Sequence, residues 1–151
     1  MSKVNSNEEI LEFSIAKEVE AYHFYMALAG RVDDPKIRQV FEDFADEELE
    51  HKAKLELEIT KLGKTVSTEL KPGRSGDGYV LIDGAAVLNM DYRDALLLAI
   101  QKEEAAFRIY VNLIGTVEDV QSHEVLLELA QQEVKHKLRF EAEYDALLKE
   151  A

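Results

Sequence analysis

An internal repeat constrains this chain more than any other feature of its sequence. With an offset of 85 residues, the stretches 10–62 and 95–147 are identical at 18 of 53 positions without a gap. Chance would give about three or four identities at typical residue frequencies. The identities include Gly30 with Gly115, where a turn residue interrupts each copy. A duplicated helical hairpin explains this pattern better than an array of many short repeats.

Helical periodicity and turn residues predict four long helices. The first copy predicts helices over about 6–30 and about 35–62, and the second copy predicts helices over 92–114 and about 120–149. Within each copy the connection is short, so the two helices form an antiparallel hairpin. The expected fold is therefore all-α, a four-helix bundle made of two duplicated hairpins.

The region between the copies predicts a long crossover. We expect one domain over 1–151, with hairpins at about 7–62 and 92–149 joined by residues 63–91. This link is rich in glycine and turn formers, and it lets the second hairpin return along the bundle. Its apolar run from Tyr79 to Ile82 predicts a short extended segment that covers the bundle or pairs with another chain.

Composition excludes several classes of function. A formal net charge of -13 leaves no basic surface for a nucleic acid, so we expect no such partner. The absence of cysteine excludes disulfides, thiolate catalysis and cysteine-ligated metal sites in this sequence. No apolar run approaches 18 residues and the first residues lack an apolar leader segment, so we expect a soluble, cytoplasmic protein with no membrane partner.

A Glu-x-x-His motif occurs once in each copy of the repeat. A Glu and a His three residues apart lie on one face of a helix, about one turn apart, so both can bind one metal ion. Each copy also carries a Glu at an equivalent position in its first helix. These six residues predict a two-metal centre: Glu18, Glu48, His51, Glu103, Glu133 and His136.

All six candidate ligands lie on apolar helix faces. At 100° per residue, Leu11 and Ile15 share the face of Glu18, and Phe41 and Leu55 share the face of Glu48. Four buried carboxylates would repel one another unless cations offset them. We find no Lys or Arg at the centre of these faces, so we expect two divalent cations to balance the four charges.

A second Glu-x-x-His pair serves as a comparison. Glu20 and His23 lie about 140–200° around the helix from Glu18, and the equivalent positions are Ala105 and Arg108. Because this pair is not repeated, we expect it to face solvent without a ligand role.

The six-residue pattern resembles the two-iron carboxylate site of the ferritin-like superfamily, and rubrerythrins and bacterioferritins are the most similar families. The resemblance spans both hairpins. It implies that each histidine binds one iron and that glutamates bridge or chelate, and which glutamate bridges stays open. Tyr25 and Tyr110, seven residues after Glu18 and Glu103, are expected either to hydrogen bond the ligand carboxylates or to pack as core aromatics.

The chain departs from the rubrerythrin pattern at two points. Rubrerythrins usually place another Glu one turn after the ligand of the third helix, where this chain has Ala106, and the site resembles bacterioferritins there. The cysteine-rich electron-transfer module of full-length rubrerythrins has no counterpart in this sequence. The resemblance therefore implies a separate electron donor, such as a rubredoxin-like protein.

Among the functions that the resemblance implies, we expect a di-iron oxidoreductase of rubrerythrin type that reduces hydrogen peroxide. The alternatives are a ferroxidase or iron-handling protein of bacterioferritin type, which uses dioxygen or peroxide, and a metal-binding bundle without turnover. Two irons are expected, and di-manganese or mixed-metal centres stay open. We also expect a homodimer, for which the long crossover permits exchanged hairpins.

Overall fold

The computed structural model describes residues 7–61, 63, 89–118 and 120–150, and these residues form four helices. The first hairpin consists of α1 (Asn7–Ala29) and α2 (Pro35–Lys61). The second hairpin consists of α4 (Tyr92–Ile114) and α5 (Val120–Glu150). No strand occurs in the described residues, which confirms the all-α prediction, and the four helix ranges agree with those predicted to within one or two residues.

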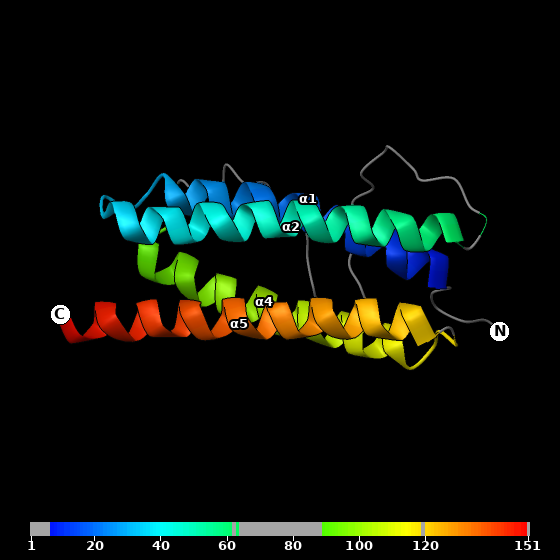
Figure 1. Ribbon diagram of the computed structural model, residues 1–151. Coiled ribbons are helices and arrows are strands. Elements are labelled where there is room, and N and C mark those ends of the chain that lie inside the picture. The colour runs from blue at the N-terminus through cyan, green and yellow to red at the C-terminus, as the bar shows by residue number, and fades with distance from the viewer. Residues whose placement is uncertain (1–6, 62, 64–88, 119, 151) are drawn as a thin grey trace.

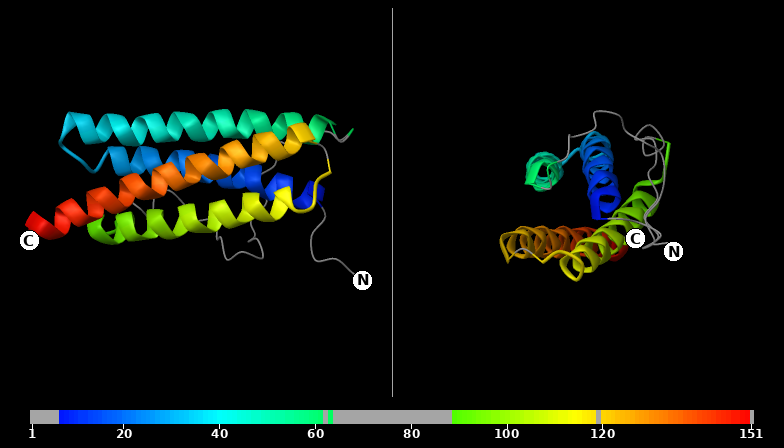
Figure 2. Two further views of the ribbon diagram at one scale, coloured as in Figure 1. Left: turned by 60° about the horizontal axis from the view of Figure 1, so that its bottom comes forward. Right: turned by 90° about the vertical axis from the view of Figure 1, so that its right-hand side faces the viewer.

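The two hairpins lie one against the other along their length, as Figures 1 and 2 show. Within each hairpin the helices are antiparallel, and between the hairpins α2 runs in the same direction as α4. A chain that connects two parallel helices must return along the whole bundle. The order of the helices thus explains the length of the segment between α2 and α4, as in bundles with one crossover connection.

The first hairpin turns where the sequence predicts it. Asp34 precedes α2, and its Oδ1 accepts a hydrogen bond from the Lys36 amide at 2.8 Å. Such a bond satisfies one of the amides that a helix leaves without a partner in its first turn. Pro35 then occupies the first helical position, where a missing N–H costs nothing.

The predicted segment Tyr79–Ile82 lies outside the described residues.

The core consists of two apolar clusters, one toward each end of the bundle. One is built around Ile15, Leu55, Ile109 and Leu129, and the other around Phe24, Phe41, Leu96 and Phe140. Each helix contributes to both clusters. In every helix, at least one predicted metal ligand lies between the residues that belong to one cluster and those that belong to the other. A polar layer therefore crosses the middle of an otherwise apolar core.

None of the helices that the structure describes is both long enough and apolar enough to cross a membrane.

Candidate metal centre

The six predicted ligands meet in the polar layer at the middle of the bundle. Each is at most 2% exposed, although all six are ionisable. They come from all four helices, because the repeat places one Glu on the first helix and a Glu-x-x-His pair on the second helix of each hairpin. The structure therefore brings together every residue of the predicted centre. Their role as metal ligands stays a prediction.

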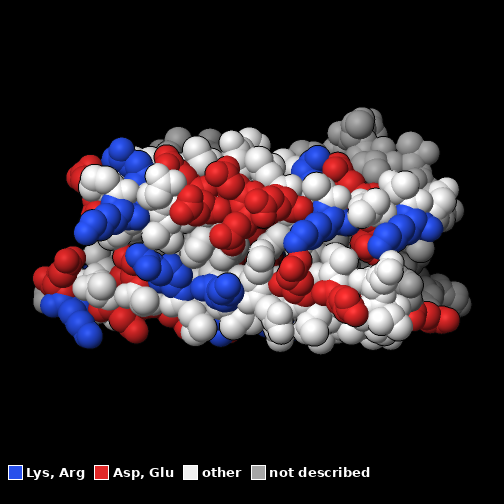
Figure 3. All heavy atoms as spheres, viewed as in Figure 1, with Lys and Arg blue, Asp and Glu red and all other residues white. Residues whose placement is uncertain are grey.

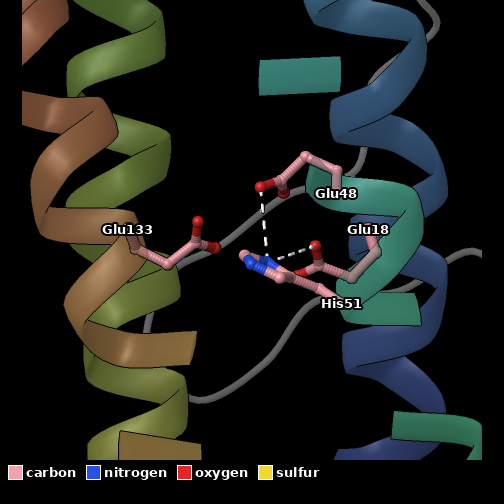
Figure 4. Close-up of side chains that lie close together, drawn as sticks. All are labelled: Glu18, Glu48, His51 and Glu133. Atoms are coloured by element: carbon pink, nitrogen blue, oxygen red, sulfur yellow. Dashed lines mark ion pairs between the residues drawn. The ribbon is translucent and has the colours of Figure 1, made fainter. Parts of the chain in front are cut away.

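The six side chains form two groups that share one residue. Glu18, Glu48, His51 and Glu133 each offer a ligand atom within 4.8 Å of the others, and so do Glu103, Glu133 and His136. Figure 4 shows Glu133 reaching from α5 toward the first group, whose other members come from α1 and α2. Two neighbouring metal positions follow, and Glu133 belongs to both.

Glu48 also lies between the two positions. Its Oε1 is 3.5 Å from Nδ1 of His51 and 3.4 Å from Nδ1 of His136. Glu133 Oε1 is likewise 3.5 Å from Nδ1 of His136. Glu48 and Glu133 therefore lie between the two histidines, whereas Glu18 lies beside His51 and Glu103 lies beside His136.

Unsatisfied polar atoms show that these residues fit a metal centre. Among the described residues, five buried side-chain N and O atoms have no hydrogen-bond partner, and all five belong to the first group: one oxygen each of Glu18 and Glu133, both oxygens of Glu48, and Nδ1 of His51. A buried polar atom without a partner costs about 1–3 kcal/mol, more if charged. Oxygen and imidazole donors that converge in this way suit Fe²⁺, Mn²⁺ and similar ions.

Lys17 contradicts the expectation that no basic residue reaches the centre. Its ammonium group is fully buried, 2.5 Å from Glu18 Oε1 and 3.5 Å from Glu48 Oε2, and it donates a hydrogen bond to Glu133 Oε2. The ammonium also lies 5.1 Å from the centre of the Tyr110 ring. One positive charge thus faces four carboxylates, so Lys17 offsets only part of their repulsion.

The charges in the layer shift the pKa values of its members in opposite directions. Burial alone would raise the pKa of Glu18, but the Lys17 ammonium and His51 bring it far below its usual value. Burial and the neighbouring Glu133 and Glu18 carboxylates raise the pKa of Glu48 well above its usual value. The bridging position of Glu48 is therefore the one where a negative charge lacks compensation most.

The second group is organised by an ion pair between Glu103 and His136. His136 Nδ1 is 2.7 Å from Glu103 Oε2. Burial would lower the pKa of His136, but the Glu103 carboxylate raises it to about 10. Burial and the charge of Glu133 raise the pKa of Glu103 to about 7. Without a metal ion, a proton is thus held between these two side chains at neutral pH.

Each histidine directs Nδ1 toward the carboxylates and Nε2 toward a partner on the opposite hairpin. His136 Nε2 donates to Glu47 Oε1 at 2.7 Å, and His51 Nε2 donates to Gln132 Oε1. Such partners fix the orientation and tautomer of a metal-binding histidine. We did not predict Glu47 or Gln132 from the sequence. The signal was present, because the two residues are 85 positions apart and each precedes the Glu of a Glu-x-x-His motif.

The two predicted tyrosines occupy different surroundings. Tyr110 donates a hydrogen bond from its hydroxyl to Glu18 Oε1, across the hairpins, and burial next to that carboxylate raises the pKa of its phenol. Tyr25 packs edge-on against His136, with 6.1 Å between ring centres, and against Phe140. Tyr110 thus bonds a ligand carboxylate, and Tyr25 packs against a ligand histidine.

The comparison pair requires one correction. His23 is exposed, as predicted, but Glu20 is only 9% exposed, and it accepts a hydrogen bond from Lys102 on α4. Its side of α1 faces α4 and not solvent. Burial lowers the pKa of Lys102 despite this pair. Lys102 is the repeat equivalent of Lys17, yet it bonds a carboxylate outside the candidate centre.

Comparison with known proteins supports the predicted resemblance. Residues 9–79 match the rubrerythrin family model. The matched region covers α1 and α2 and therefore three candidate ligands, Glu18, Glu48 and His51. No curated protein matches the chain.

Solved structures extend the similarity to both hairpins. A hypothetical protein from Pyrococcus furiosus is 26% identical with a TM-score of 0.76, and the alignment covers 95% of this chain and 91% of that one. KatB, a manganese catalase from Anabaena PCC7120, is 17% identical with a TM-score of 0.67, covering 97% of this chain and 77% of that one. This rubrerythrin-like chain thus has the ferritin-like helical-bundle fold, and its buried Glu and His cluster is consistent with a di-metal site.

Proposed function

We propose that this chain is a rubrerythrin-type di-iron oxidoreductase that reduces hydrogen peroxide with electrons from a separate donor. The observation that carries the proposal is the convergence of buried, unsatisfied carboxylate and imidazole atoms from both hairpins. Without metal, Lys17 and a protonated His136 supply two positive charges against four carboxylates, and five buried polar atoms of the described residues still lack a hydrogen-bond partner. Stable burial of this set therefore calls for further cations. The match to the rubrerythrin family supports iron as the metal.

The candidate ligands divide between two metal positions. Glu18 and His51 would hold one ion, Glu103 and His136 would hold the other, and Glu48 and Glu133 lie between the two. When bound, two ferrous ions supply two electrons and Lewis acidity to the peroxide, which takes up two protons and yields two water molecules.

The surrounding residues prepare the site for this chemistry. Glu47 and Gln132 hold the two rings with Nδ1 inward, and Tyr110 holds Glu18 through its hydroxyl proton. Lys17 keeps a protonated ammonium beside the carboxylates, because Glu133 and Glu18 raise its pKa well above its usual value although burial opposes this. The apolar clusters on both sides limit the access of water to the layer. The layer can therefore keep its charged groups in a core with little water.

We also propose an electron donor for the reaction, because reduction of peroxide consumes two electrons that must be returned to the centre. A separate rubredoxin-like protein is the donor that we propose. We also propose a cytoplasmic location and a homodimer, with exchange of hairpins through the long crossover as one way to form it.

Anaerobic reaction of the iron-loaded protein with peroxide tests the proposal. Diferrous protein is mixed with H₂O₂ in stopped flow, and one peroxide is expected to oxidise two irons per chain. Glu133→Ala, which removes the residue shared by both groups, is the inactive comparison, and His23→Ala, on the surface, is the active control. Iron that stays ferrous in excess peroxide contradicts the proposal.

The same preparation distinguishes the other reactions of this fold. Because KatB is a manganese catalase, protein loaded with Mn²⁺ is assayed in parallel for oxygen release from peroxide without any donor. Oxygen release by the manganese form, together with an iron form that does not react with peroxide, would contradict the proposed peroxide reduction and support catalase activity instead. Aerobic uptake of iron far beyond two ions per chain would instead replace it by iron handling.

A further inference from the structure

The outer partners of the two histidines break the symmetry of the repeat. Glu47 and Gln132 occupy equivalent positions, and each bonds the histidine of the opposite hairpin. The partner of His136 is a carboxylate, whereas the partner of His51 is a neutral amide. The two partners thus differ in one functional group, a carboxylate in place of an amide, at equivalent positions of the repeat.

A carboxylate partner makes a histidine a stronger metal ligand than an amide partner does. The carboxylate accepts the Nε2 proton and pushes electron density through the ring toward Nδ1, which raises the basicity of that nitrogen. In both histidines Nδ1 is the atom that faces the candidate ligand carboxylates. His136 is therefore the stronger donor of the two. Figure 3 shows a group of acidic side chains on the outer face of α2, over the middle of that helix.

Lys17 adds a second asymmetry in the same direction. Its ammonium contacts Glu18, which belongs only to the group around His51, and the two shared carboxylates of Glu48 and Glu133. The ammonium therefore lies closer to the His51 position and repels a cation there more strongly. Lys102, its repeat equivalent, pairs with Glu20, and its charge also interacts with Glu103, but the ion pairs of Lys17 are with the candidate ligands themselves.

We propose that the two metal positions are inequivalent. The position at Glu103, Glu133 and His136 binds a divalent transition-metal ion first and tightly, and the position at Glu18, Glu48 and His51, which shares Glu133, binds a second ion more weakly. Glu47 strengthens the first position by acting on His136, and Lys17 weakens the second. This inference rests on the two-metal centre proposed above and does not depend on the reaction that the centre catalyses.

A Co²⁺ titration of the metal-free protein tests the inference. Binding to the full chain is followed by the visible absorption of cobalt and by calorimetry, under anaerobic conditions. Two binding steps are expected, with dissociation constants at least about tenfold apart. His136→Asn should remove the tight step, and His51→Asn should remove the weak one. The reverse assignment would overturn the inference.

Reciprocal substitutions separate electronic effects from structural ones. Glu47→Gln should weaken the tight step by about 10–100-fold, the usual cost of losing such a partner, and Gln132→Glu should tighten the weak step in the same way. A general loss of packing cannot produce this gain. Lys17→Met should also tighten the weak step, whereas Lys102→Met, the matched control, should leave the weak step unchanged. Far-ultraviolet circular dichroism verifies that each variant is folded.

The outcomes distinguish failure of this inference from failure of the proposed centre. Two equal steps in the parent protein, or reciprocal variants that leave both steps unchanged, would overturn the asymmetry while the di-metal centre stands. No cobalt binding at all would overturn both.

Discussion

Replacement of Lys17 by methionine should destabilise the metal-free protein much more than the metal-loaded protein. The ammonium is fully buried and contacts three carboxylates, and its pKa is raised above the usual lysine value. Its stabilising effect is therefore present at pH 7 and is lost only when the pH rises through that raised pKa. Removal of one partner from a buried ion pair costs about 3–5 kcal/mol. For a chain of this length, that loss lowers Tm by about 6–20 °C, at 2–4 °C per kcal/mol.

Bound metal should reverse most of this loss. Two divalent cations would supply the positive charge that Lys17 provides in their absence, and removal of the ammonium would also remove its repulsion of those cations. We therefore expect the difference between the parent protein and Lys17→Met to fall below about 1 kcal/mol in saturating Mn²⁺, the size of one weak ion pair. Urea unfolding followed by circular dichroism, with EDTA or with Mn²⁺, measures both differences.

Lys102→Met provides the control for this experiment. Lys102 is buried and paired like Lys17, but its partner Glu20 is not a candidate ligand. The cost of its loss should therefore change much less between EDTA and Mn²⁺ than the cost of losing Lys17. The reasoning is refuted if Lys17→Met unfolds at the same urea concentration as the parent protein in EDTA, or if Mn²⁺ leaves its deficit unchanged.

Three further substitutions make related predictions. Glu48→Gln should stabilise the metal-free protein at pH 7, because a carboxyl whose pKa is raised contributes stability only at low pH and loses it as the pH rises. It should also abolish metal binding at the position of Glu18, Glu48 and His51, and urea unfolding and metal counting measure the two effects. His136→Asn should lower the free energy of unfolding more at pH 6 than at pH 10. The stabilising contribution of the protonated His136 is complete below about pH 6.5 and is lost as the pH rises through about 10. Equal costs at both pH values would contradict this. Tyr110→Phe should cost about 1.5–3 kcal/mol in EDTA, the value of a hydrogen bond to a charged group, and an unchanged urea midpoint would show that its bond to Glu18 contributes nothing.

The fold was predictable because the repeat and the helical period agree along the whole chain. The offset of 85 residues places Glu18 on Glu103 and Glu48 on Glu133, and the apolar residues around them repeat at helical spacing. Those two observations are enough to place the ligands on inward helix faces. What they leave open is which carboxylates lie between the two metal positions, since that depends on how the hairpins pack.

Lys17 was missed because a helical projection shows where a side chain starts and not where it ends. Lys17 lies 100° around the helix from Glu18, but four methylene groups carry its ammonium back to the layer of carboxylates. The same limit applies to Glu47 and Gln132, which are next to ligands in sequence and reach the opposite hairpin. Glu20 was placed in solvent because the projection treated α1 as having one buried face, whereas a helix in a four-helix bundle contacts two neighbours.

Anomalous scattering from a crystal of the protein loaded with Mn²⁺ or Fe²⁺ tests the di-metal centre most directly. The account predicts two peaks per chain in the polar layer, both next to Glu48 and Glu133, one beside Nδ1 of His51 and the other beside Nδ1 of His136. A layer without anomalous peaks at saturating metal, or peaks only at the acidic outer face of α2, would contradict it.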